Sequence, residues 1–229
     1  MIVACIVYPG MTLLDLVGPL QVLRTAGAAR GWTVHTVGAG TSPVETDAGL
    51  DVAATATFDD VPEPDVVVVP GGGAPTFRAM DDRTLLAYLA GSGRNGATLT
   101  SVCTGSLLLG AAGLLEGRPA TTHWAFLDAL PVFGATPVGE RWVDGGHDPR
   151  IITAAGVSAG IDMALHLVAE LADEATARAV QFGIEYDPQP PQGPLDWAAA
   201  PREPWRQIRH RMLADGLGAS SPWRARLLG

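Results

Sequence analysis

Short apolar, β-branched segments alternate with segments of helical pattern along most of this chain, and this alternation is the strongest constraint on its fold. Near-continuous apolar runs such as Ile2–Tyr8 are typical of strands buried on both faces of a parallel sheet. Strand–helix–strand connections place helices on both faces of such a sheet, so an α/β fold is predicted. The predicted strands are Ile2–Tyr8, Thr33–Val37, Asp65–Val69 and Ala97–Val102, and the predicted helices are Asp15–Ala26 with Gly27 as its end, Pro75–Ala90 with Asp81 and Asp82 on its wet face, and Leu107–Leu115.

The second half of the chain continues this pattern and then changes composition. A short helix follows Thr121–His123, and the segment from Asp187 to Pro204 carries six prolines, which predicts an extended surface segment. We therefore expect one α/β domain over residues 1–186 and a tail over 187–229 that packs on it. The remaining predicted strands are Val138–Val143 and Ile151–Ala154, and the remaining helices are Val157–Leu171, Asp173–Phe182 and an arginine-rich one near Trp205–Leu213.

The charged residues exclude several classes of function. All 15 basic residues are arginine, and the absence of lysine excludes Schiff-base chemistry, a pyridoxal-phosphate lysine and a Walker A loop. The net charge of −9 argues against a broad nucleic-acid-binding surface. A stripe of arginines near the end of the chain is interpreted as a solvated helix face, or one that pairs with acidic surface. These arginines are Arg202, Arg206, Arg209 and Arg211.

Metal, disulfide and membrane sites are not expected either. The two cysteines, Cys5 and Cys103, form no CxxC pair, and His147-Asp148 lies in a Gly- and Pro-rich hairpin without partners. The apolar N-terminus lacks the basic region of a signal peptide. The uncharged stretch Asn95–Leu115 holds polar residues and glycines, so it is interpreted as a buried strand, turn and helix. A soluble cytoplasmic protein without cofactor, metal, nucleic-acid or membrane partner is expected.

The segment Thr98–Leu109 carries the chemistry. A strand is predicted to end at Val102, Cys103 lies at the turn, Gly105 follows, and a helix begins at once, which is the pattern of a nucleophile elbow. The helix N-terminus favours a thiolate, and the carboxyl end of a central strand is where open α/β sheets bind ligands. A buried, inert cysteine is the alternative, and it describes Cys5 within its strand.

A glycine run follows a second predicted strand. Without side chains, the backbone N–H groups of Gly72 and Gly73 could face the cysteine and, with the N–H of Thr104, stabilise a developing negative charge. Glycine clusters after strands are also common without such a role, so both interpretations stay open.

Three segments resemble a known family: SVCTGSLLLGAAGLLEGRPATTHW, the opening YPGMTLLDLVGP, and GVSAGIDMAL. They are similar to the DJ-1/PfpI superfamily, with the class I glutamine-amidotransferase-like fold, and within it to the bacterial isocyanide hydratases. The resemblance implies a flavodoxin-like three-layer sandwich with a mostly parallel central sheet, a homodimer, and a cysteine nucleophile at Cys103. It also implies an acidic partner matching Asp15, where many members have glutamate.

Other residues depart from the family's branches. The peptidase-like branch has Cys-His at the elbow, but Thr104 follows the cysteine here, so a proteolytic triad is not expected. Thr104 is either a hydroxyl donor to the catalytic cluster or a residue that fills space at the helix start. His123 lies twenty residues beyond Cys103, where DJ-1-like proteins have a histidine near the thiol, and its alternative role is a packed helix cap. Because Asp15 is shorter than glutamate, glyoxalase-like chemistry is less favoured.

Three functions remain in competition. The resemblance implies hydration of an isocyanide to an N-substituted formamide through a cysteine thioimidate. The second is a ligand-sensing domain like those of AraC-type regulators, whose DNA-binding part would be missing here. The third is a DJ-1-like glyoxalase or stress protein. The expected partners are a small-molecule substrate and a second copy of the chain, which the apolar helix around Leu16, Val17 and Leu20 would contact.

Overall fold

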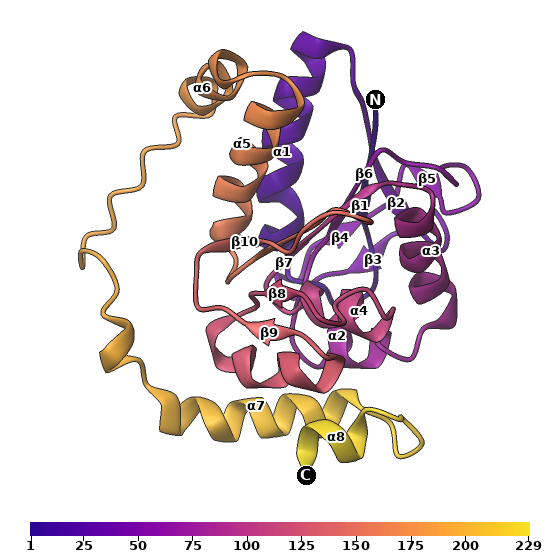
Figure 1. Cartoon of the computed structure of the whole chain (residues 1–229), viewed down its shortest axis with the longest axis vertical. Helices are drawn as coiled ribbons and strands as arrows, with labels where there is room; N and C mark the ends of the chain where they lie inside the picture. Colours follow the sequence, from indigo (N-terminus) through magenta and orange to yellow (C-terminus); the bar gives the residue numbers. More distant parts are fainter.

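The computed structural model describes residues 1–229 and is built around a seven-stranded sheet (Figure 1). The strand order is β10-β11-β7-β6-β1-β2-β5, and every neighbouring pair is parallel except β10 and β11. The predicted α/β fold with a mostly parallel central sheet is confirmed. The strands are β1 (Ile2–Ile6), β2 (Thr33–Gly38), β5 (Ala56–Thr57), β6 (Val66–Val69), β7 (Thr98–Val102), β10 (Trp142–Asp144) and β11 (Ile151–Ala154).

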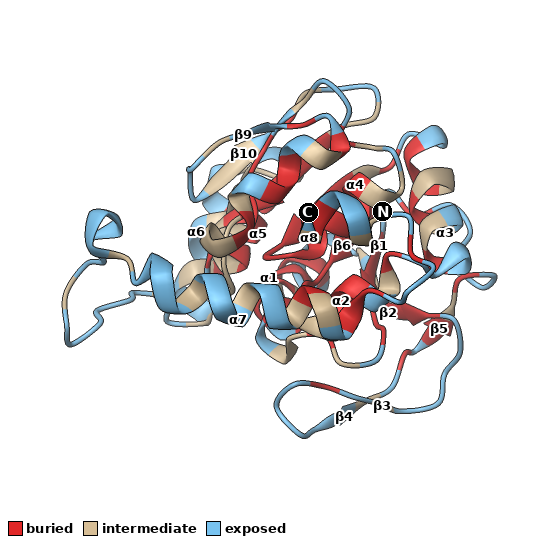
Figure 2. Cartoon of the chain, turned by 90° about the horizontal axis from the view of Figure 1, so that it is seen from below, coloured by how far each residue is buried: buried red, intermediate tan, exposed pale blue.

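Helices cover both faces of this sheet. On one face α1, α5 and α6 pack against one another, and on the other α3 and α4 pack together against β7 (Figure 1). These layers enclose a core in which the central strands are buried on both faces, as Figure 2 shows for β1 and β6. The helices of the domain are α1 (Leu13–Arg30), α2 (Ala74–Ala79), α3 (Arg83–Arg94), α4 (Gly105–Ala111), the 3-10 helix η1 (Trp124–Phe133), α5 (Ala159–Leu171) and α6 (Glu174–Gly183).

The valine run in β6 explains why the sheet has this centre. All four residues of Val66–Val69 are buried, and β-branched side chains pack well on a pleated surface that helices cover on both sides. The parallel register pairs Val69 with Ser101 at the carboxyl ends of β6 and β7. The loop after β6 and the turn after β7 therefore lie side by side.

Several predicted boundaries are wrong. The helix predicted over Pro75–Ala90 is two helices, because the Asp82 carboxylate accepts the N–H groups of Thr84 and Leu85 and so begins α3, instead of lying on a wet helix face. Gly27 does not end α1; it lies inside the helix, close to the Trp32 carbonyl, and the end is formed by Gly31 at φ 69°.

The segment predicted as a strand over Val138–Val143 also differs. Val138 donates its N–H to the Ala120 carbonyl beside a small parallel pair, and β10 begins only at Trp142. This small pair and a second one lie outside the main sheet. Their strands are β8 (Pro119–Ala120) with β9 (Thr136–Pro137), and β3 (Val44–Glu45) with β4 (Asp51–Val52).

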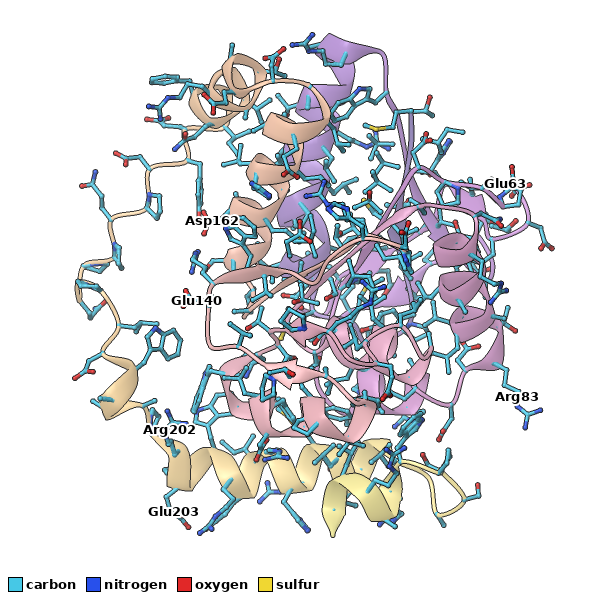
Figure 3. The ribbon with its side chains drawn as sticks, viewed as in Figure 1. Glu63, Arg83, Glu140, Asp162, Arg202 and Glu203 are labelled. Carbon is cyan, nitrogen blue, oxygen red and sulfur yellow. The ribbon has the colours of Figure 1, made fainter.

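The chain after Asp187 runs along the outside of the domain and then returns to it (Figure 1). It contains η2 (Trp197–Ala199), α7 (Arg202–Gly216) and α8 (Arg224–Leu228), so the last helix region is longer than predicted. Arg202 and Glu203 begin α7, which packs on α2 and η1 (Figure 3). No helix in the structure combines the length and apolarity that crossing a bilayer requires.

The first helix presents an apolar face to solvent that keeps Val17 from the predicted residues but not Leu16, and Leu20 is partly buried against the core. Leu16 is fully buried in the core, whereas Leu14 and Val17 are 47% and 37% exposed. The face expected to contact a second copy is therefore centred on Leu14 and Val17.

Candidate active site

Cys103 lies at a sharp turn between β7 and α4. Its φ of 57° is in the left-handed region, which only glycine adopts without strain. The turn is held by the Cys103 N–H, which donates to the Ala155 carbonyl at 2.8 Å, and by the Thr122 hydroxyl, which donates to the Cys103 carbonyl at 3.0 Å. A Cβ at Gly105 would lie 2.3 Å from the Val69 carbonyl oxygen, so only glycine permits this close approach of helix and strand. The predicted elbow geometry is present.

Asp15 is the acidic group beside this turn. It lies in the first turn of α1 and is fully buried. Its Oδ2 accepts the N–H of Gly71 at 3.0 Å, while its Oδ1 is buried without a hydrogen-bond partner. The Cys103 thiol lies close enough to lower the pKa of this carboxyl. The structure thus brings together the two residues that the sequence assigned to the chemistry.

Burial determines the protonation of this pair. Burial raises the pKa of Asp15 to about 7, against the opposing effect of the hydrogen bonds from Gly71 and Cys103. Burial also raises the pKa of the Cys103 thiol, and the neighbouring Asp15 charge raises it further. The expectation that the helix N-terminus would favour a free thiolate is therefore wrong in the absence of substrate. The desolvation of the thiol raises its pKa by more than the nearby N–H groups lower it.

The Thr104 hydroxyl connects the elbow to the glycine loop. It accepts the Gly72 N–H at 2.8 Å and donates to the Gly72 carbonyl at 2.7 Å. A hydroxyl has one proton, so in this structure Thr104 does not donate its hydroxyl proton to the thiol, and the Gly72 N–H is not free for an oxyanion. The backbone N–H groups of Thr104 and Val157 lie near the thiol and lower its pKa against burial, and the Gly73 N–H has no partner within the chain.

His123 caps η1. Its Nδ1 accepts the Ala125 N–H at 3.3 Å, its ring packs 5.3 Å from that of Trp205, and burial lowers its pKa. No hydrogen bond joins it to Cys103 or Asp15. The packed-cap interpretation therefore describes its contacts.

Two contributors to the site were missed in the sequence. Gly71, rather than its neighbours, donates to Asp15, and the Val157 backbone N–H lies near the Cys103 thiol and lowers its pKa. Val157 has a φ of 23°, an outlier for a β-branched residue. Nothing in the segment GVSAGIDMAL signals this, because the pattern indicates a regular helix start, whereas α5 begins only at Ala159. The glycine run did signal a loop contact, but not which N–H makes it.

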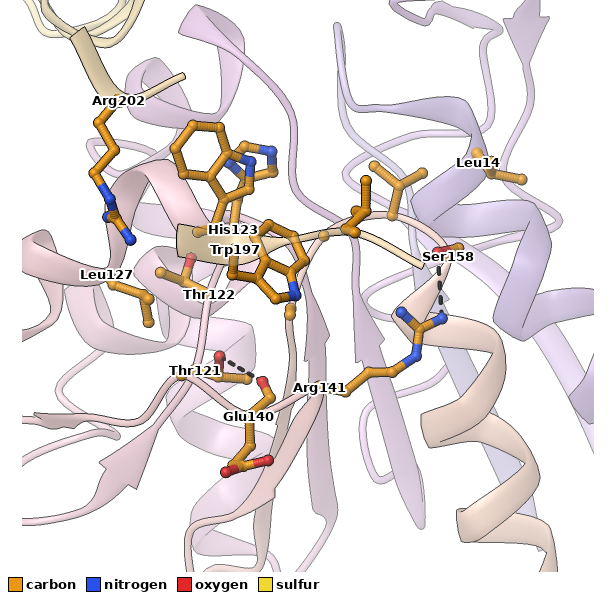
Figure 4. A pocket seen from close by; sticks show the side chains of 16 residues that line it. Leu14, Thr121, Thr122, His123, Leu127, Glu140, Arg141, Ser158, Trp197 and Arg202 are labelled. Carbon is orange, nitrogen blue, oxygen red and sulfur yellow. Dashed lines mark hydrogen bonds between the residues drawn. The ribbon is translucent and has the colours of Figure 1, made fainter. Parts of the chain in front are cut away.

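A cavity of about 560 Å³ opens beside the elbow (Figure 4). Its wall includes Thr122, whose hydroxyl bonds the Cys103 carbonyl, and Val157, whose N–H lowers the pKa of the thiol; Leu14, the residue before Asp15, lines it as well. The site therefore combines a nearly buried cysteine at an elbow, a carboxyl group of raised pKa and space nearby for a small molecule, which defines a candidate enzyme of the cysteine-elbow α/β class.

The chain belongs to the DJ-1/PfpI family, whose model matches residues 1–170. It is 44% identical over 186 residues to the isonitrile hydratase of Pseudomonas putida, covering 81% of this chain and 78% of that protein. It is 33% identical to the HTH-type transcriptional regulator CdhR of Pseudomonas aeruginosa, covering 72% of this chain and 49% of the regulator. A crystal structure of a ThiJ/PfpI family protein from Pseudomonas syringae superposes with a TM-score of 0.85 at 41% identity, covering 94% of this chain and 88% of that one.

Proposed function

We propose that this protein is an enzyme that adds water to an isocyanide, R–N≡C, to give an N-substituted formamide. The observation that carries the proposal is the burial of Cys103 and Asp15 side by side at the elbow, next to a cavity. We infer that the two side chains share one proton above neutral pH. The similarity to an isonitrile hydratase over most of both chains supports the same reaction.

In the first step the Cys103 sulfur attacks the terminal isocyanide carbon, and the proton held by the pair is transferred to that carbon. A C–S bond and a C–H bond form, and the product is a thioimidate, Cys–S–CH=N–R, beside an Asp15 carboxylate. The sulfur supplies its electron pair and the pair supplies its proton in the same step. No additional uncompensated charge therefore forms in the buried site.

In the second step water adds to the thioimidate carbon. The hydroxyl oxygen bonds to carbon, the other hydrogen of water goes to nitrogen, and Asp15 orients the water. The C–S bond then breaks, the hydroxyl proton passes to Asp15, and the formamide leaves with the one-proton pair restored. The N–H groups of Thr104, Val157 and Gly73 are the donors proposed to stabilise the negative charge that develops in these steps.

Mass spectrometry after mixing with an aryl isocyanide tests the proposal. We expect an adduct of one isocyanide on Cys103, or free formamide in solution, and loss of both in Cys103→Ala. Cys5→Ala is the matched control, because that thiol is fully buried in β1 and burial raises its pKa to about 12. Turnover by Cys103→Ala would contradict the proposal.

Two variants of Asp15 test its role. Asp15→Asn is expected to lower kcat about a hundredfold or more, the scale of general acid–base help. Asp15→Glu is expected to be poor as well, because the longer side chain fills space beside a buried thiol. Wild-type rates in Asp15→Asn would remove the acid–base role.

A ligand-sensing domain is the second candidate, favoured by the similarity to a transcriptional regulator, of which the chain spans about half the length. It predicts reversible binding of a small molecule in the cavity without turnover. A methylglyoxal assay run beside the isocyanide assay tests the glyoxalase alternative. That alternative predicts turnover of methylglyoxal and no turnover of the isocyanide.

A further inference from the structure

The cavity beside the elbow has an aromatic outer wall, part of which comes from the Pro-rich tail. His123 and Trp124 line it from η1, and Trp197 lines it from η2, more than seventy residues later in the chain (Figure 4). The rings of Trp124 and Trp197 lie 6.4 Å apart, and Trp124 is supported by Trp205 of α7 at 5.3 Å. The tail therefore completes a ring-lined space that the domain alone leaves open.

One wall of the same cavity is formed by residues next to Cys103, although Cys103 itself does not line it. This wall includes Ala155, whose carbonyl accepts the Cys103 N–H, and Val157, whose N–H lowers the pKa of the Cys103 thiol. A substrate whose isocyanide carbon reaches the sulfur would place its R group in this space, toward Trp124 and Trp197.

Size and charge indicate which R group fits. A volume of about 560 Å³ falls in the range of sites that enclose drug-sized ligands, so it greatly exceeds a small alkyl group. The cationic side chain of Arg141 in the wall is paired with Asp162, and burial lowers the pKa of His123, which favours its neutral form. Two charged side chains, Glu140 and Arg202, also line the cavity without an ion-pair partner, and both are exposed. Between them the wall offers the ring faces on which a planar aromatic group stacks.

We propose that this cavity is an R-group site for aromatic isocyanides, and that Trp197 on the tail is a specificity-determining residue. The inference rests on the proposed isocyanide hydration for its substrate class. The statement that aromatic groups bind in this cavity can be tested without any turnover.

Kinetics with two substrates test it. For Trp197→Ala, we expect kcat/KM for 2-naphthyl isocyanide to fall about tenfold more than for ethyl isocyanide, mainly through KM, because one aromatic contact is lost. Trp197→Phe is expected to restore most of the preference. Phe182→Ala is the matched control, since this ring is 78% exposed on α6 and does not line the cavity. Equal losses for both substrates would overturn the proposal.

Binding of N-(2-naphthyl)formamide, measured by calorimetry, separates this inference from the proposed function. Binding that weakens about tenfold in Trp197→Ala but not in Phe182→Ala supports the aromatic site even if no isocyanide is hydrated. Isocyanide turnover with unchanged naphthyl binding in Trp197→Ala overturns the site and leaves the proposed function standing. A Trp197→Ala protein whose mass in solution differs from that of the wild type also overturns it, because the ring would then serve an interface between copies.

Discussion

Replacing Asp15 by asparagine is expected to change how the stability of the fold depends on pH. Burial raises the pKa of Asp15 from its ordinary 3.8 to about 7, so the folded protein keeps a proton in this window that the unfolded chain releases. Because the folded state binds more protons there, the free energy of unfolding falls as the pH rises through the window and levels off above about 7. This is the opposite of a salt-bridged aspartate, which stabilises the fold as the pH rises.

The expected size of this effect follows from the same pKa. The displacement from 3.8 to about 7 corresponds to about 4 kcal/mol over the whole window, at about 1.4 kcal/mol per pH unit. Between pH 5 and pH 8 the wild type should lose about 2.5 kcal/mol through this group. The amide that replaces the carboxyl in Asp15→Asn does not titrate, but its oxygen can still accept the Gly71 N–H, which lies 3.0 Å from Oδ2 in the wild type.

Urea unfolding of both proteins at intervals from about pH 5 to about 8 measures the difference. The other ionisable groups contribute equally to both proteins, so they cancel in the difference. The free energy of unfolding of Asp15→Asn minus that of wild type should therefore rise across this range. Asp187→Asn is the control, because its carboxyl lies exposed on the tail and the same chemical change there should leave the curve parallel to wild type. Parallel curves for Asp15→Asn and wild type would refute the reasoning that an ionisable group is desolvated at this position.

Three further outcomes are expected. Cys103→Gly should be about 1 kcal/mol more stable than Cys103→Ala in urea, because only glycine adopts a φ of 57° freely; equal stabilities would contradict strain at the elbow. Gly105→Ala should lose about 2 kcal/mol or more, because its Cβ would lie 2.3 Å from the Val69 carbonyl oxygen, whereas Gly91→Ala in α3 meets no atom closer than 3.8 Å and should not destabilise the fold. Light scattering should report twice the 23.7 kDa of one chain, with Val17→Glu shifting the protein toward monomer; a wild-type monomer would contradict the predicted homodimer.

The parts of the fold that the sequence predicts well are those set by local pattern. The valine run of β6 and the strand–turn–helix around Cys103 are each specified by neighbours along the chain, and a parallel sheet then brings their carboxyl ends together. Asp15 is different. Its partnership with the thiol was implied by the family resemblance, since no local pattern distinguishes a buried catalytic carboxylate from one on the first turn of a surface helix.

The predictions that failed depend on contacts between distant segments or on a single side chain that overrides a periodic pattern. Apolar periodicity continues across Asp82, so one helix was predicted where its carboxylate caps a new one. Val157 adopts a positive φ that its β-branched side chain disfavours, and only its surroundings in the folded protein hold it there. The position of Trp197 at the cavity is likewise set by how α7 packs on α2 and η1, which the tail composition does not encode.

The strain around the thiol and the burial of the pair have a common consequence. Cys103 and Val157 both have positive φ, a conformation that costs on the order of 1–3 kcal/mol for each residue. These conformations bring the Val157 N–H near the sulfur, where it lowers the thiol pKa against burial. Burial still has the larger effect, so a free thiolate does not accumulate beside Asp15. In the proposed mechanism the nucleophile is therefore generated only when a substrate accepts the proton of the pair, so reaction at Cys103 is expected to depend on a bound group that can be protonated rather than on the pH of the solvent alone.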